Sequence, residues 1–360
     1  MFLGETQAQF AAVVGMAQSQ LSAVENDAHQ LGDEGVVLAI SEHTGFPPDF
    51  FECAPDRPID NVQFRARLTF KAADRNRVMS CADILHESYA RMRKQLEVLQ
   101  VRVERSVGLD PRQAARSFRK ALLLPSGPIP NLTSPVERHG VVILALPVVG
   151  KKHDAFSTWH MEGDDSYPLI ATLAGSPGDR IRWNIAHEIG HLLLHNGGSG
   201  QDIEREADTF AAELLTPMDA MSAEIPMRPK LSALYAMKLR WGVSVQSLIR
   251  RAREVERVTD EQYTSLFRQV SARGERMSER YQITREKPRM YRKMAEVLYG
   301  DLPAPGLSAL CAWTEEFAMD VLEQYASKSE IPSRRVLVSQ RTSQDRSNVV
   351  ELHGRSRRSN

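Results

Sequence analysis

Two histidines and one glutamate stand at the spacing of a hydrolytic metal site. They are His187, Glu188 and His191, in the order H-E-x-x-H. Residues four apart lie on one face of a helix, so both imidazoles can reach one Zn²⁺ ion while Glu188 takes a proton from water. Zinc is therefore the expected cofactor, although imidazole and carboxylate also suit Mn²⁺ or Fe²⁺. The alternative interpretation is an ordinary helix with two surface histidines.

A third protein ligand is needed, and the next acidic segment offers it. His195 is excluded, because it would lie about 12 Å from His187 along a straight helix, too far to share one ion. His195 is predicted to cap the helix or to contact a metal-binding residue without binding the metal itself. Glu204 and Asp208 are four apart, which lets Glu204 bind zinc while Asp208 hydrogen-bonds the free nitrogen of a ligand histidine. Glu206 as the ligand, or a solvent-facing charged helix, are the alternatives.

Two helices and a small sheet must position these side chains. The first helix is predicted over Arg180–His195, with Asp179 as its N-cap and with glycines after Asn196 to end it. The second spans about Ile203–Leu215. Runs rich in β-branched and aromatic residues predict three strands, Val141–Leu146, Phe156–Met161 and Leu169–Leu173. Further helices are predicted over 80–107, 110–124 and 231–274.

These segments resemble the ImmA/IrrE metallopeptidases, a gluzincin-like group. The resemblance is carried by RIRWNIAHEIGHLLLH at 180–195 and EREADTFAAELLTP at 204–217, and it extends over 113–146 and 231–274. In that family, paired histidines and a glutamate of the second helix bind zinc. The implied zinc ligands here are His187, His191 and Glu204, with Glu188 as the general base.

The resemblance implies peptide hydrolysis and a cleaved protein that is a transcriptional repressor or an antitoxin. Leu169–Leu173 precedes the helix with the histidines, and we expect this strand to pair with an extended substrate. Candidate donors to the oxyanion of the reaction are Tyr167, His160 and Tyr235. The alternative function is a DNA-binding regulator whose metal site is a sensor or a structural element. Glu188 favours the enzyme, because a structural site needs no general base.

Residues 6–26 predict two short helices around a turn at Gly15. They resemble the helix-turn-helix of XRE (Cro/C1-type) repressors, which share T-Q-x-x-[LF]-A, a turn glycine and a recognition helix ending E-N. The family's first helix would precede Thr6, where five residues stand, so we expect either that this helix is missing and the unit is truncated, or that the true start lies upstream. The implied DNA contacts are Gln18, Ser19 and Ser22 in the major groove and Gln7 at a phosphate.

The distribution of charge opposes DNA binding by this unit. The chain has 46 Lys and Arg and 46 Asp and Glu, so its formal net charge of zero offers no bulk attraction to nucleic acid. Residues 1–56 carry nine acids and no Lys or Arg, so the remainder carries +9. Phosphate contacts come from Lys and Arg, which the Arg91–Arg105 stretch or the tail would have to supply. DNA binding, dimerisation and docking of a partner repressor are therefore all open roles, and a homodimer is one expected assembly.

Composition sets the remaining limits. The chain has 360 residues, 42% hydrophobic and 26% charged, which predicts a folded protein of two or three domains. Its three cysteines, Cys53, Cys81 and Cys311, lie far apart, which predicts reduced thiols and not a disulfide framework or a cysteine zinc site. No signal peptide or long apolar run is found, so we expect a cytoplasmic protein without membrane contact.

The predicted fold class is α+β and mostly helical, with a helix-turn-helix, a gluzincin-like zinc metallopeptidase domain containing a small sheet, and a helical C-terminal region. The predicted domains are the helix-turn-helix without its first helix at 1–50, a linker at 51–79, the ImmA/IrrE-like domain at 80–225, a helical segment at 226–300, and an extension at 301–360 with a disordered basic tail from about 333.

Overall fold

The computed structural model describes residues 5–25, 34–52, 72–96, 100–149, 155–162, 165–198 and 200–326. The chain divides into Met1–Ala326 and Ser327–Asn360. The second part lies outside the described residues, as do the tail predicted from about 333 and Cys53. Among the described residues, no helix is long and apolar enough to span a membrane. Cys81 and Cys311 are buried free thiols.

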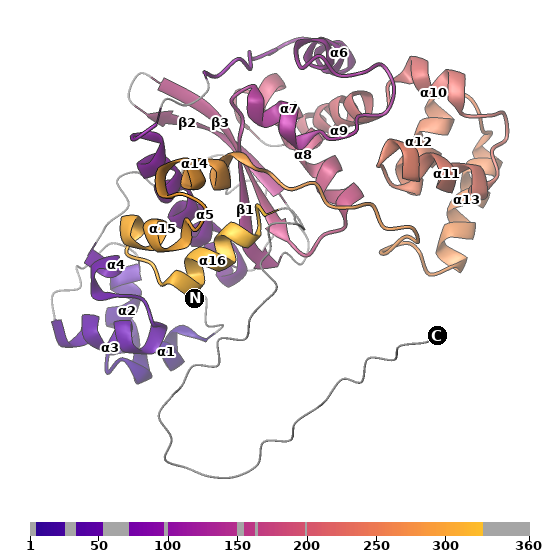
Figure 1. The fold of residues 1–360 in the computed structure, drawn as a ribbon. Coiled ribbons are helices and arrows are strands. Elements are labelled where there is room, and N and C mark those ends of the chain that lie inside the picture. The colour runs from indigo at the N-terminus through magenta and orange to yellow at the C-terminus, as the bar shows by residue number, and fades with distance from the viewer. Residues whose placement is uncertain are drawn as a thin grey trace, which may run out of the picture. The chain divides into compact units, whose positions relative to one another are not determined.

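The described elements are mostly helices with one small sheet, which is compatible with the predicted α+β class (Figure 1). In chain order they are α1 Gln7–Val13, α2 Gln18–Glu25, α3 Glu34–Thr44, α4 Pro48–Glu52, α5 Ala72–Arg93, α6 Pro111–Ala121, α7 Thr133–Arg138, β1 Val142–Val149, β2 Ala155–Glu162, β3 Asp165–Ala174, α8 Gly178–Leu194, α9 Gln201–Leu215, α10 Met218–Glu224, α11 Leu231–Trp241, α12 Val245–Glu254, α13 Asp260–Ala272, α14 Met290–Tyr299, α15 Ala304–Cys311 and α16 Glu315–Glu323.

The three strands form one mixed sheet in the order β1-β3-β2. β1 runs parallel to β3, with Val142 opposite Leu169, and β2 runs antiparallel to β3, with Thr158 opposite the same Leu169. Both edges of β3 are paired from Leu169 to Thr172. The expectation that this strand pairs with a substrate is therefore wrong, because its backbone groups are already used. The edge strand beside α8 is β2.

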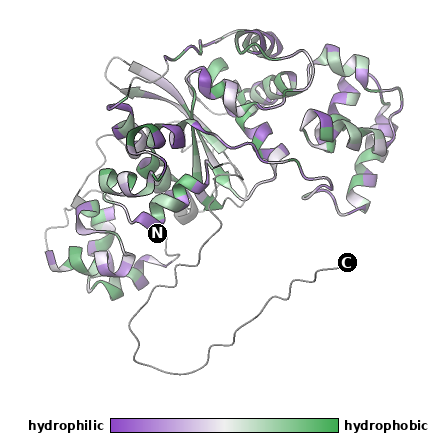
Figure 2. Cartoon of the chain, viewed as in Figure 1, coloured by the Kyte–Doolittle hydropathy of each residue, from purple (hydrophilic) through white to green (hydrophobic). Residues whose placement is uncertain are grey.

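The sheet separates two hydrophobic cores. On one face, Ile143 and Ile170 pack into the core of α6, α8 and α9. On the other, Leu144 and Leu169 pack against α5, α14 and α16 (Figure 1). Because β1 is buried on both faces, it is apolar almost throughout and carries the hydrophobic colour in Figure 2. The sheet thus provides a rigid platform for α8.

A close approach of α8 and α9 depends on Gly190. A Cβ atom at this position would lie 3.1 Å from Cα of Ala207 and 3.2 Å from Cβ of Phe210, tighter than ordinary van der Waals contact. Glycine therefore lets the backbones of the two helices come together near the middle of α9. This contact brings the side chains of α9 toward the histidines of α8.

Residues 275–289, the return segment, connect α13 to α14 and cross the beginning of α8. Gly178, the first residue of α8, would place a Cβ 2.3 Å from the carbonyl oxygen of Ile283. Buried Arg182 of α8 pairs with Glu286, whose carboxylate also accepts the backbone N–H groups of Leu132 and Thr133. The return segment thus fixes the first turns of α8 to α7.

The helix expected over 80–107 has different bounds. α5 begins at Ala72, inside the range predicted as a linker, and ends at Arg93. Beyond it, Arg102 donates its backbone N–H to the carbonyl oxygen of His139, and Ser106 donates to that of Leu193. Arg102 and Arg105 therefore do not share a helical face with Arg91, and the helix predicted to continue to residue 107 ends at Arg93.

The N-terminal helices match the two predicted over 6–26. α1 and α2 flank Gly15, whose φ is +72°. Thr6 and Gln9 form a capping box at the start of α1. After α3, the ring of Phe46 lies 5.3 Å from that of Phe317 in α16. These helices contain no Lys or Arg, as the sequence requires.

Candidate metal centre

The helix with the two histidines is positioned by its buried face and by its two ends. Apolar side chains such as Ile185 and Ile189 anchor α8 in the core. The N-cap is Pro177 and not Asp179 as predicted; Asp179 lies in the first turn, where it binds buried Lys238. At the other end, His195 has extended φ and ψ angles and donates its backbone N–H to the carbonyl oxygen of His191.

Three side chains converge on one point between α8 and α9. One ligand atom from each of His187, His191 and Glu204 lies within 4.8 Å of the other two. The two Nε2 atoms are 2.9 Å apart, and the Glu204 carboxylate oxygens lie 3.3 Å from Nε2 of His187 and 3.5 Å from Nε2 of His191. Two imidazoles and a carboxylate are the donor set of many divalent-metal hydrolases.

Each histidine is held at its other ring nitrogen. Nδ1 of His187 lies 2.9 Å from Oδ1 of Asp208. Nδ1 of His191 lies 3.1 Å from Nδ1 of His195, whose Nε2 is 2.9 Å from Oε2 of Glu206. Both arrangements orient the imidazoles so that their Nε2 atoms face the common point. Glu206 therefore contacts His195 in the structure and does not join the cluster.

Glu188 lies beside the cluster and is almost buried. One of its carboxylate oxygens accepts a hydrogen bond of 2.5 Å from the hydroxyl group of Ser157 on β2. Trp159, two residues further along this strand, donates its indole N–H to the carbonyl oxygen of Leu192. Sequence reasoning missed Ser157, because a serine in a strand of alternating polar and apolar residues carries no signal of a partner 31 positions away.

The acids around His187 favour a positive charge there. Burial alone lowers the pKa of His187, but hydrogen bonds to Asp208 and Glu204 outweigh it, and the pKa is raised to about 10. The electrostatic field that holds a proton on this imidazole also attracts a divalent cation.

The three candidate oxyanion donors lie elsewhere. Tyr167 and His160 are buried with His86 on the face of the sheet that packs against α5, opposite Glu188. Tyr235 in α11 donates its hydroxyl hydrogen to Glu275 of the return segment. The sequence placed Tyr167 and His160 near α8 along the chain, but strand alternation turns their side chains away from it.

The candidate DNA contacts lie on α1 and α2. Gln18 donates a 2.6 Å hydrogen bond to the amide oxygen of Gln7, which in turn donates to Glu25 at 2.6 Å. Gln18 and Ser19 are exposed, and Ser22 is half-buried. Whether these side chains contact DNA stays a prediction.

The domain that contains the cluster is similar to a known family. Residues 136–253 match the family model Peptidase_M78, the IrrE N-terminal-like domain. This match supports a metallopeptidase of the ImmA/IrrE type. The match runs from α7 to α12 and includes all three clustered residues and Glu188, whereas α1–α4 lie outside the IrrE-like domain. No curated protein matches the chain.

Proposed function

We propose that this protein is a zinc-dependent endopeptidase that cleaves a transcriptional repressor or antitoxin in the cytoplasm and thereby regulates gene expression. The observation that carries the proposal is the convergence of His187, His191 and Glu204 beside the buried carboxylate of Glu188. The match of residues 136–253 to the IrrE-like metallopeptidase domain supports the same chemistry.

The donor set fits a divalent metal ion. His187, His191 and Glu204 would hold it, and the ion would polarise the scissile carbonyl group and lower the pKa of a water molecule. Zinc is the metal we propose, because tetrahedral nitrogen and oxygen coordination with one open position is typical of catalytic zinc. Metal analysis of the purified protein distinguishes it from Mn²⁺ or Fe²⁺.

Glu188 would act as the general base and then as the general acid. Its carboxylate takes the proton of the attacking water and delivers it to the nitrogen of the departing amine. Ser157 donates a 2.5 Å hydrogen bond to one carboxylate oxygen of Glu188, which helps to fix the rotamer of this side chain. Asp208 and His195 keep the imidazoles in the required orientation.

The strand proposed to pair with an extended substrate is β2. It is an edge strand, it packs against α8, and its Ser157 contacts the general base. Backbone pairing with a strand edge is a common way to bind extended peptides. N-methylation of a substrate amide next to the scissile bond should then raise KM without changing the metal content of the enzyme.

The decisive experiment compares wild type with Glu188→Gln, an isosteric change that removes the base. Each protein is incubated with candidate repressors and antitoxins, and fragments are identified by mass spectrometry while metal content is measured in parallel. Loss of cleavage with metal retained supports the proposal. Equal cleavage by both proteins, or no cleavage of any candidate or of a complex peptide library by wild type, contradicts it.

DNA binding by α1 and α2 is a separate proposal. It rests on the resemblance of residues 6–26 to XRE-type helix-turn-helix units. The absence of Lys and Arg from residues 1–56 means that phosphate contacts must come from elsewhere in the chain. An electrophoretic shift assay tests this, and an unshifted operator at low salt would leave dimerisation or repressor docking as the role of this unit.

A further inference from the structure

A cleft with a cavity volume of about 560 Å³ adjoins the cluster of His187, His191 and Glu204. It lies between the first turns of α8, the middle of α9, the start of α12 and the return segment. The cleft reaches the cluster at Asp208, which holds His187, and at Asn184, one helical turn before Glu188. If a substrate is cleaved at the cluster, the neighbouring part of the same substrate would thus lie in this cleft.

Basic side chains from separate parts of the chain meet in this cleft. Arg112 comes from α6, Arg180 from α8, Arg205 from α9, Arg250 from α12 and Arg276 from the return segment, and all five are exposed. Their positions are widely separated in sequence, so the concentration of positive charge is produced by the fold and not by a local run of arginines. Neighbouring guanidinium groups raise the local concentration of anions.

The acidic residues of the same cleft already have partners. Asp179 and Glu279 both bind Lys238, and Glu279 also accepts the backbone N–H groups at the start of α12. Asp208 binds His187, and Glu254 pairs with buried Arg251 at 2.5 Å. The contacts of these acids are therefore with groups other than the exposed arginines of the cleft.

By contrast, two of those arginines have no acidic partner in the described part of the chain. Arg250 lies over the ring of Phe267 at 5.8 Å, and it forms no ion pair with any described residue. Arg276 accepts a hydrogen bond from Gln246 only through its backbone carbonyl oxygen, and its guanidinium likewise has no ion pair among the described residues. Both side chains are available to a ligand.

We propose that this cleft binds acidic side chains of the substrate, close to the scissile bond, through Arg250 and Arg276. The inference rests on the proposed peptidase function and specifies its substrate class. Guanidinium groups form paired, charge-assisted hydrogen bonds with carboxylates. A cleft of this volume admits a few side chains, whereas a nucleic acid duplex presents its phosphates along an extended surface, so an acidic peptide is the occupant that fits.

The binding test uses two fluorescein-labelled peptides that differ only in three Glu or three Gln residues. Their dissociation constants are measured by fluorescence anisotropy with the full chain as purified, at low and at moderate salt. Wild type should bind the Glu peptide about tenfold more tightly at low salt, and the preference should shrink as salt screens it. Equal affinity of wild type for both peptides overturns the proposal.

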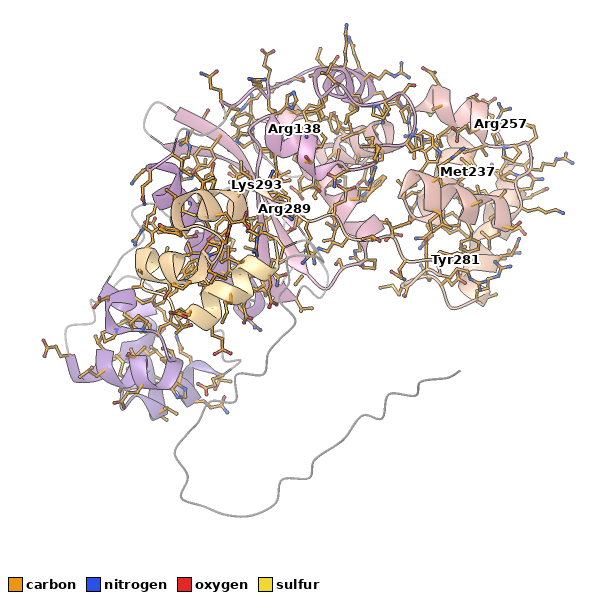
Figure 3. The ribbon with its side chains drawn as sticks, in the orientation of Figure 1. Arg138, Met237, Arg257, Tyr281, Arg289 and Lys293 are labelled. Atoms are coloured by element: carbon orange, nitrogen blue, oxygen red, sulfur yellow. The ribbon has the colours of Figure 1, made fainter. Side chains whose placement is uncertain are left out.

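The variants are the double change Arg250→Glu and Arg276→Glu, and the control Arg138→Glu. Arg138 is an exposed arginine on α7 that does not line the cleft (Figure 3). The double variant should lose the preference for the Glu peptide, and the control should keep it. Thermal unfolding checks that all the variants are folded. A preference that survives in the folded double variant contradicts the role of these two arginines.

Cleavage of a complex peptide library separates this inference from the proposed function. Cut sites that depend on Glu188 and are enriched in Asp or Glu within a few residues support both. Glu188-dependent cut sites without this enrichment overturn the acidic specificity and leave the peptidase standing. Absence of Glu188-dependent cleavage contradicts the peptidase, and the anisotropy measurement then decides the binding of acidic peptides by itself.

Discussion

Oδ1 of Asp208 lies 2.9 Å from Nδ1 of His187, so a carboxylate of α9 fixes the ring orientation of a histidine in α8. Replacing Asp208 by Asn removes the charge and keeps the shape. Because such outer partners typically change metal affinity by about 10- to 100-fold, we expect a loss of this size in a chelator competition assay. Asp202→Asn, at the exposed start of the same helix, is the control. Unchanged affinity in Asp208→Asn would show that the contact does not support the metal.

The second histidine is supported less directly. Glu206 reaches His191 only through His195, with contacts of 2.9 Å and 3.1 Å. Glu206→Gln should therefore weaken metal binding by less than Asp208→Asn, about two- to tenfold on the same scale. The two variants are compared in one competition assay. A larger effect from Glu206 would indicate that it binds the metal itself, which was the alternative left open by the sequence.

Ser157 hydrogen-bonds Glu188, the proposed general base. In Ser157→Ala the carboxylate of Glu188 loses a 2.5 Å hydrogen bond and is held less firmly in its position. Misplacing one catalytic group by a small distance costs a large factor in rate, so kcat should fall by about tenfold or more while metal content stays unchanged. Steady-state kinetics with a cleaved peptide and metal analysis measure the two effects. A raised KM at constant kcat would instead assign Ser157 to substrate binding.

The ion pair of Arg182 and Glu286 should be a large contributor to stability. Both side chains are mostly buried, and Glu286 also accepts backbone N–H groups from Leu132 and Thr133. Glu286→Ala leaves a buried guanidinium without its partner, which should lower the free energy of unfolding by about 3 kcal/mol. Urea denaturation measures this change in the free energy of unfolding. Glu261→Ala, an exposed site in α13, should change the same quantity by less than about 0.5 kcal/mol.

Stability should also depend on pH through His86. Burial and then the neighbouring His160 lower its pKa from 6.5 to about 3, while Tyr167 bonds its Nε2 at 2.8 Å. The unfolded chain therefore binds an extra proton between these values, so stability present at pH 7 is lost as the pH falls through 6.5. Between pH 7 and pH 5 the loss from this group is about 2 kcal/mol.

The measurement is urea unfolding of wild type and His86→Gln at both pH values. The glutamine keeps hydrogen-bonding atoms but does not titrate in this range. The variant is expected to lose less stability than wild type on acidification, whatever its stability at pH 7. Identical losses in the two proteins would mean that His86 has the same pKa in the folded and the unfolded state.

Local patterns in the sequence predicted those features of the fold and of the site that depend on helical periodicity and on strand composition. His187 and His191 are four residues apart, as are Glu204 and Asp208. On a helix this spacing places both members of each pair on one face, so a predicted helix was enough to predict that they lie together. The structure brings three of these side chains together and places Asp208 against His187. Their roles in metal binding stay predictions until the metal is measured.

Features that depend on tertiary topology could not be predicted in this way. The order β1-β3-β2 places β3 in the centre, although β3 directly precedes α8 in sequence. Ser157 and Arg250 reach the neighbourhood of the site from elements distant in the chain, and neither has a local signature. Tyr167 and His160 were plausible by proximity along the chain, but the pleat of the sheet directs both to the opposite core.

The contact of Gly178, at the start of α8, determines at what stage of synthesis this helix can reach its final packing. Gly178 packs against the backbone carbonyl of Ile283, which leaves the ribosome about a hundred residues later, several seconds behind at ordinary rates of synthesis. Until then α8, which carries the histidines, lacks the return segment that crosses its first turn. We therefore expect the cluster of His187, His191 and Glu204 to take its final arrangement only after the return segment has been made.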